Sequence, residues 1–201
     1  MASMVIWPIG IVLSVAVLVV VAAMQQFYLH TAIAAIVGIG FALASRSEVR
    51  AADGNEQGVA LALRHMGCVW AWGTLGLVAT YASGVLTWRE WWQFCIAFAL
   101  LAGLSLLLAA TLRKDAATGA VDPMFVKVAR GFAIFILIAM IITMVGLLID
   151  GKMWRFFTVP GQKPGSQDWG ANNFFFFGAL AQALISVSVI KLTGEQQAKA
   201  A

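Results

Sequence analysis

Charged residues are scarce in this chain. Only 11% of its 201 residues are Asp, Glu, Lys or Arg, whereas 62% are hydrophobic. In a soluble globular domain about a quarter of the residues are charged, because water must solvate the outer surface. The composition therefore excludes a soluble globule and indicates a chain that lies mostly within a membrane.

The charges that are present form no nucleic-acid-binding surface. The net charge of +4 comes from Lys and Arg residues that are spread thinly along the chain. A protein that binds nucleic acid concentrates its basic residues in one patch, commonly with aromatic side chains that stack on bases. We therefore expect no nucleic-acid partner.

Residues that bind metals or form disulfides are also few, with two His and two Cys in the whole chain. His30 and His65 belong to different predicted helices, and at a rise of about 1.5 Å per residue their depths differ by roughly 20 Å or more. Cys68 and Cys95 are separated by about a bilayer thickness, whereas a disulfide needs Cα atoms within roughly 7 Å. We expect free thiols, no metal site and no cofactor. A single-histidine tetrapyrrole ligand at His30 is the alternative.

Acidic residues are missing from the middle of every predicted helix. Intramembrane carboxylates are the usual mark of proton or sodium coupling, so a proton-coupled pump is not expected. The chain also lacks a phosphate-binding glycine motif, a nucleophile elbow and a metalloprotease helix. We therefore predict that the protein is not an enzyme.

Long apolar runs fill most of the chain, and six of them reach about the 20 residues needed to cross a bilayer core of ~30 Å. Lipid cannot pair with backbone N–H and C=O groups, so these runs must be helical. The sequence predicts a single-domain, all-α integral membrane protein: a bundle of six transmembrane helices in three antiparallel hairpins. The predicted helices span residues 5–24, 27–44, 66–87, 92–112, 126–149 and 172–192.

The basic residues are unevenly divided between the two sides of this predicted bundle. Nine fall on the side that carries both termini, and four fall on the opposite side. Short loops rich in Lys and Arg face the cytoplasm. We therefore predict a multi-pass protein of the inner membrane, surrounded by the lipid bilayer, with both termini in the cytoplasm. The first apolar run lacks the basic start of a signal peptide and is interpreted as a spanning helix.

Aromatic residues gather at the turns on the outer side. The turn after the third run joins tryptophans to opposite charges: Trp88, Arg89, Glu90, Trp91 and Trp92. Tryptophan is typical of the membrane interface, so we interpret this group as an anchor and a candidate contact surface. We interpret residues 151–170 as a structured cap, with a lid over a binding site as the alternative. The three outer turns look alike at a period of about 62 residues, which leaves open a hairpin repeat.

Small residues recur at every fourth position on several predicted helices, where they let a neighbouring backbone approach closely. The sets are Ala34, Gly38 and Ala42; Gly76, Thr80 and Gly84; and Ala99 with Gly103. We single out Gly76 and Gly84 as candidate interface positions, either within the chain or toward another protein.

Few polar residues lie within the predicted spans. Gln182 is at mid-membrane, where its amide needs a partner, so it should face another helix or a polar cavity that Tyr81 could share. Arg130 lies about one turn inside the fifth helix and, with Lys127, is a candidate for binding a lipid phosphate from the cytoplasmic side. The alternative for Arg130 is a side chain that extends to the interface without a specific ligand.

These features favour a non-catalytic accessory or scaffold protein, which acts by packing against itself as a homo-oligomer or against partner membrane proteins. The small-residue faces, the lack of intramembrane charge and the lack of a soluble domain are the reasons. A passive channel or carrier for a small uncharged solute is the alternative, with Gln182 and Tyr81 shaping its path. A pigment-binding or haem-binding protein is a third hypothesis, which the scarcity of histidine disfavours.

Overall fold

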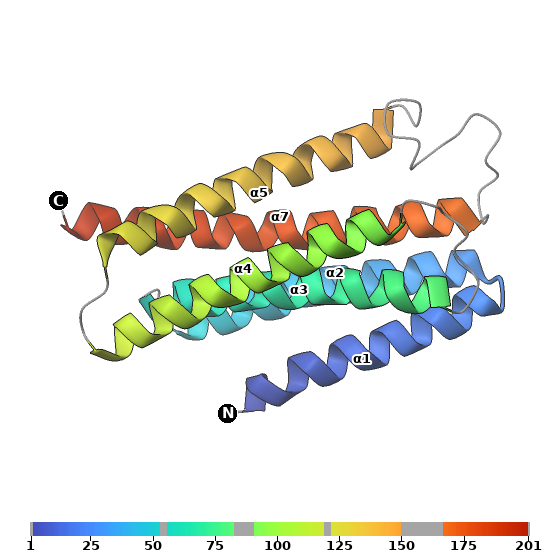
Figure 1. The fold of residues 1–201 in the computed structure, drawn as a ribbon, viewed down its shortest axis with the longest axis horizontal. Coiled ribbons are helices and arrows are strands. Elements are labelled where there is room, and N and C mark those ends of the chain that lie inside the picture. The colour runs from blue at the N-terminus through green and yellow to red at the C-terminus, as the bar shows by residue number, and fades with distance from the viewer. Residues whose placement is uncertain (1, 53–55, 83–90, 119–121, 150–166, 201) are drawn as a thin grey trace.

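The computed structural model describes residues 2–52, 56–82, 91–118, 122–149 and 167–200, which form six helices and no strand. The helices run in roughly the same direction or its reverse (Figure 1). They are α1 (Ala2–Ala23), α2 (Phe27–Ala51), α3 (Glu56–Ala82), α4 (Trp91–Thr118), α5 (Pro123–Ile149) and α7 (Gln167–Ala200). The predicted all-helical architecture is confirmed for this part of the chain.

Five of these helices are long and apolar enough to cross a membrane. The qualifying segments are Ile6–Ala23, Phe27–Ala51, Trp92–Arg113, Pro123–Leu148 and Gly170–Glu195. Fewer than half of the residues in the most apolar part of each segment are buried inside the protein, and the exposed large hydrophobic side chains are mostly Ile, Leu and Val. An apolar outer surface of this kind suits lipid rather than water.

Helix α3 is the sixth helix, and it lies at the centre of the bundle. It contacts α1, α2, α4 and α7, and Leu63, Met66 and Trp72 are completely shielded. Its surroundings are other helices, so its polar residues can find protein partners and need not face lipid. This position explains how α3 can belong to the bundle although its described residues contain no segment apolar enough to span a membrane.

The helices extend beyond the apolar runs that predicted them. Helix α2 continues to Ala51 instead of ending at residue 44, and α3 begins at Glu56 instead of residue 66. Hydrophobicity ends where charges begin, whereas the backbone helix continues because residues 45–51 contain neither Gly nor Pro. Pro8 lies inside α1, because this helix begins at Ala2 and not at residue 5 as predicted.

A very tight turn joins α1 to α2. Gln25 has a φ of 57°, in the left-handed region, and Gln26 donates a backbone hydrogen bond to the Val21 carbonyl at 3.1 Å. This is a common way for a helix to end, although glycine is the usual residue at the left-handed position. The turn allows the beginning of α1 to lie next to the end of α2.

The small residues of α2 form its contact surface with α7. Ala34, Gly38 and Ala42 are all buried, and a Cβ atom added to Gly38 would lie 2.8 Å from the backbone oxygen of Phe177. Real Cβ atoms essentially never approach a backbone atom so closely. The prediction that this stripe admits a neighbouring backbone is confirmed.

Helices α4 and α5 are consecutive in the sequence but touch each other only sparsely. Helix α4 packs against α3, and α5 packs against α7; Figure 1 shows α5 diverging from α7 toward the C-terminal end of α5. Helices α4 and α5 are therefore connected mainly through α3 and α7, and the space between them leaves room for the cavity described below.

Candidate functional site

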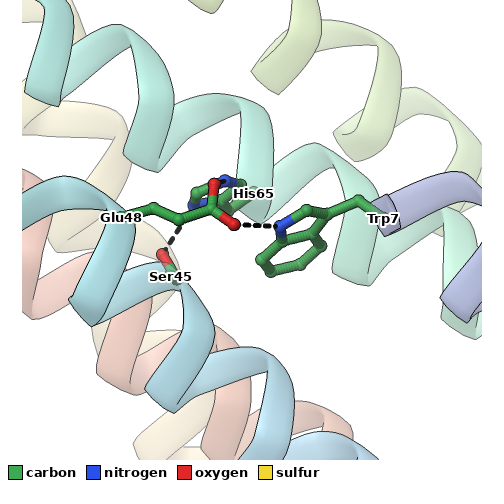
Figure 2. A network of polar contacts seen from close by, with 4 residues as sticks. All are labelled: Trp7, Ser45, Glu48 and His65. Atoms are coloured by element: carbon green, nitrogen blue, oxygen red, sulfur yellow. Dashed lines mark hydrogen bonds and ion pairs between the residues drawn. The ribbon is translucent and has the colours of Figure 1, made fainter. Parts of the chain in front are cut away.

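A polar cluster joins three helices near the beginning of α1 (Figure 2). Glu48 of α2 accepts a hydrogen bond from the indole nitrogen of Trp7 at 3.0 Å, and its second oxygen lies 3.0 Å from Nε2 of His65 on α3. The other ring nitrogen of His65, Nδ1, lies 2.9 Å from the Ser45 hydroxyl. Both nitrogens of the buried imidazole are therefore satisfied, as buried polar groups require.

Aromatic stacking holds the same residues together. The Trp7 ring is nearly parallel to the His65 ring at a centroid distance of 4.2 Å and to the Phe41 ring at 5.0 Å. The indole is 4% exposed. Trp7 thus combines stacking with a hydrogen bond to a carboxylate, and it attaches α1 to both α2 and α3.

A serine, a histidine and a carboxylate in one hydrogen-bonded row also occur in hydrolases, where the hydroxyl attacks a substrate. Attack requires that the substrate reach the hydroxyl. Ser45 is only 1% exposed, and it lines none of the cavities described below. We therefore assign the cluster a structural role.

Sequence reasoning missed this cluster because it placed Ser45 and Glu48 in a loop. The available signal was the spacing of the two residues, three positions apart, which puts them on one face if α2 continues. Their partners Trp7 and His65 could be identified only with knowledge of which helices are neighbours.

A cavity of about 130 Å³ lies between α3, α4, α5 and α7. Most of its wall is aromatic or aliphatic, and the side chains of Thr143 and Gln182 add the few polar atoms. The aromatic and thioether groups come from all four helices: Trp70, Trp72, Phe94, Phe98, Met140, Phe174 and Phe175. The cavity is thus an apolar space inside the bundle.

Gln182 ties the cavity wall to the central helix. Its side chain is 1% exposed, and Nε2 donates a hydrogen bond to the backbone oxygen of Met66 on α3 at 3.0 Å. The prediction that this amide faces another helix is confirmed. Within the described ranges, the Gln182 Oε1 atom and the indole nitrogens of Trp70 and Trp72 are buried without a hydrogen-bond partner. Three residues of the cavity wall therefore each carry a buried polar atom that makes no hydrogen bond.

Tyr81, which was predicted to share a polar cavity with Gln182, lies elsewhere. Tyr81 is 43% exposed, close to the end of α3, and does not line the cavity. Helix α3 carries Trp70, Trp72 and Gly73 to the cavity instead. The structure therefore does not bring Gln182 and Tyr81 together.

His30 is buried against the rings of Phe27 and Phe174, at centroid distances of 6.5 and 6.3 Å. The void beside it measures about 30 Å³. A cavity of about 150 Å³ binds a molecule as small as benzene, so a tetrapyrrole does not fit in this much smaller void. Gly76 lines the same void, and an added Cβ atom would lie 2.7 Å from the Phe174 ring. Gly76 is therefore used for packing within the chain.

The candidate lipid-phosphate residues lie on α5, where Lys127 is exposed and Arg130 is half-buried beside Gly194 of α7. At the opposite end, Trp92 is exposed in the first turn of α4. Trp91 begins this helix, but its side chain is not described. Several predicted sites lie outside the described residues: Gly84, Trp88, Arg89, Glu90 and most of the 151–170 connection. Their roles stay predictions, as does the hairpin repeat.

Among the residues that the structure describes, no three His, Cys, Asp or Glu side chains lie close enough to hold a metal ion. A comparison of the chain with known protein families, curated proteins and solved structures finds no match. The function must therefore be inferred from the geometry of this chain.

Proposed function

We propose that this chain is a non-catalytic membrane protein that binds a small lipophilic molecule in the cavity between α3, α4, α5 and α7. The supporting observation is the cavity itself, with its volume of about 130 Å³ and its wall of Trp, Phe and Met side chains. Ligand sites are typically apolar with a few polar groups that fix orientation. An apolar cavity of this size excludes water and accepts small apolar molecules.

The surroundings of the cavity favour entry from the bilayer. Helices α4 and α5 touch sparsely, and Phe94, Phe98 and Met140, which line the cavity from these helices, are partly exposed. A molecule dissolved in lipid can reach the cavity between these side chains. The wall is almost wholly apolar, so a polar solute would find few partners there. Binding of a lipophilic molecule is therefore favoured over the passive channel that the sequence left open.

The volume and the apolar wall define the class of ligand. A cavity of about 150 Å³ holds benzene, so a space of about 130 Å³ takes a small ring or the end of a lipophilic chain. The polar atoms of Gln182, Trp70 and Trp72 that have no hydrogen-bond partner are buried away from the surface of the cavity. The ligand class is therefore a small neutral lipophilic molecule.

The proposal includes the placement in the membrane. Five helices qualify as spans by themselves, and α3 would cross as an internal helix shielded by its neighbours. The ends of α2, α4 and α7 share one end of the bundle with the starts of α3 and α5 (Figure 1). Arg46, Arg50, Arg113 and Lys191 are carried near this end, which supports a cytoplasmic location for it and for both termini. This arrangement of helix ends agrees with three helical hairpins that cross an inner membrane.

The experiment is to purify the protein in mild detergent, extract it with organic solvent and identify the released molecules by mass spectrometry. The test variant is Gly178→Leu, because Gly178 lines the cavity and its added side chain would occupy this space. We expect the wild type to retain a small neutral lipophilic compound and the variant to lose at least nine-tenths of it. The matched control is Gly131→Leu on α5, where an added Cβ atom meets nothing within 4 Å.

Two outcomes would contradict the proposal. One is that the wild type retains no compound beyond those carried by an unrelated membrane protein in the same detergent. The other is that Gly178→Leu retains the compound as well as Gly131→Leu does. Thermal unfolding of both variants separates loss of the ligand from loss of the fold.

An accessory role through self-association is a second candidate, and an exposed small-residue stripe on α4 favours it. Ala99 and Gly103 are both exposed, and a Cβ atom added to Gly103 meets nothing within 4 Å. Stripes with this spacing allow close contact between helices of different chains.

If this stripe joins two copies, Gly103→Leu lowers the oligomeric fraction about tenfold, because the leucine side chain separates the two backbones. The fraction is measured by light scattering on the protein eluting from a size-exclusion column. Gly131→Leu serves as the control, and equal fractions for both variants would remove this candidate.

A further inference from the structure

A groove of about 480 Å³ lies between α2 and α7, toward the C-terminal ends of both helices. Its apolar part includes Ala42, Leu43, Leu184 and Val187, and its charged part consists of Arg46, Arg50, Lys191 and Glu195. A second hollow of about 380 Å³ is lined by Leu43, Arg46, Ser47 and Arg50, so the two share one side. Together they make an extended surface that is apolar in one part and basic in the other.

The order of the residues along each helix produces this division. On both helices the groove residues recur at spacings of three and four, which places them on one face. Along α2, Leu43 precedes Arg46 and Arg50, and along α7, Leu184 and Val187 precede Lys191. The two apolar spans end at Ala51 and Glu195, so the cations occupy the last turns of both. That is the depth at which lipid headgroups meet hydrocarbon.

The charge in the groove is positive and largely uncompensated. Three of its side chains are basic and one is acidic. Lys191 lies 3.9 Å from Glu195, but both are well exposed, so the pair is held weakly. In the part of the chain that the structure describes, Arg46 and Arg50 form no ion pair. The nearby carboxylate on α2, Glu48, is directed at Trp7 and His65 instead.

We propose that this groove binds an anionic phospholipid. The phosphate would lie against Arg46, Arg50 and Lys191, and one acyl chain would follow Leu43, Leu184 and Val187. Guanidinium groups match the geometry of phosphate oxygens, and the adjoining apolar surface provides van der Waals contacts for the acyl chain. Charge complementarity and apolar surface in one groove point to a lipid rather than to a free anion. The groove is separate from the intramembrane cavity and from Lys127 on α5.

The test is native mass spectrometry of the purified protein with phosphatidylglycerol and with phosphatidylcholine of the same acyl chains. We expect tighter binding of phosphatidylglycerol. A basic residue near a membrane surface contributes about a fivefold preference for anionic lipid, so the double variant Arg46→Gln, Arg50→Gln should weaken phosphatidylglycerol binding about 25-fold. Both arginines are exposed, so the fold is retained.

Three further variants separate a specific groove from general attraction. The control Arg113→Gln removes an exposed charge outside the groove and should leave the affinity within about twofold, whereas Arg46→Gln alone should weaken it about fivefold. Val187→Trp keeps every charge but fills the apolar part; Val187 is 49% exposed, so the ring is tolerated. This variant should weaken phosphatidylglycerol binding about tenfold, and millimolar inorganic phosphate should not compete.

Several results would overturn the assignment. These are equal affinity for the two lipids, an unchanged affinity in the double variant or in Val187→Trp, and an equal loss in Arg46→Gln and Arg113→Gln. Displacement of phosphatidylglycerol by inorganic phosphate would also overturn it, because the groove would then bind only the anion.

Discussion

Replacing Trp7 with alanine should lower the free energy of unfolding by about 3 kcal/mol, as expected for a large buried aromatic side chain. The substitution removes the stacking on His65 and Phe41 and leaves an empty space between three helices. It also removes the indole donor of Glu48. Apart from sparse contacts, helix α1 packs only against α2 and α3, so few other interactions can compensate for the loss of Trp7.

The variant Trp7→Phe separates stacking from hydrogen bonding. Phenylalanine keeps most of the ring but has no N–H group, so its cost should be about 1 kcal/mol, the usual net value of one hydrogen bond. Both values are measured by unfolding the protein in mixed micelles with increasing denaturing detergent. A loss below 1 kcal/mol for Trp7→Ala would show that the cluster does not hold α1.

Replacing Gly38 with valine should cost about 3 kcal/mol, at the upper end of the usual range for overpacking. The first added carbon would lie 2.8 Å from the backbone oxygen of Phe177. Backbone cannot rotate away as the end of a side chain can, so α2 and α7 must move apart. The separation would also disturb the packing of α7 against α3.

Gly40 is the matched control for this substitution. It lies two residues further along the same helix, and an added Cβ atom meets nothing within 4 Å. Gly40→Val changes the helix propensity in the same way but causes no clash, so its effect should stay within about 0.5 kcal/mol. Equal effects of the two variants would show that helix propensity, and not contact with α7, determines the stability at Gly38.

The positions of the helices could be predicted from the sequence because a bilayer requires apolar runs of a certain length. The ends of the helices could not be predicted in the same way. Ser45 and Glu48 interrupt the apolar pattern, and a reading based on hydrophobicity ends α2 before them. In the structure, His65 and Trp7 satisfy these polar side chains. The helix therefore continues through residues that would be unfavourable against lipid.

The candidate site could be predicted only in part. Gln182 stood out because an amide in an apolar helix must find a partner, and its bond to the Met66 carbonyl meets that need. The cavity exists because side chains from four helices do not fill the space between them, and no pattern within one helix predicts this. For the same reason, the sequence could not show that Tyr81 lies away from Gln182.

The central position of α3 has a consequence for how the chain is made. Among the residues that the structure describes, α3 is the helix without a segment apolar enough to span a membrane. Its neighbours shield it once the bundle is assembled. In the membrane placement proposed above, packing against α4 and α7 therefore helps to hold α3 in the bilayer, and these contacts form only after both helices have been synthesised. Biogenesis of this protein should accordingly be sensitive to truncation before the last helix.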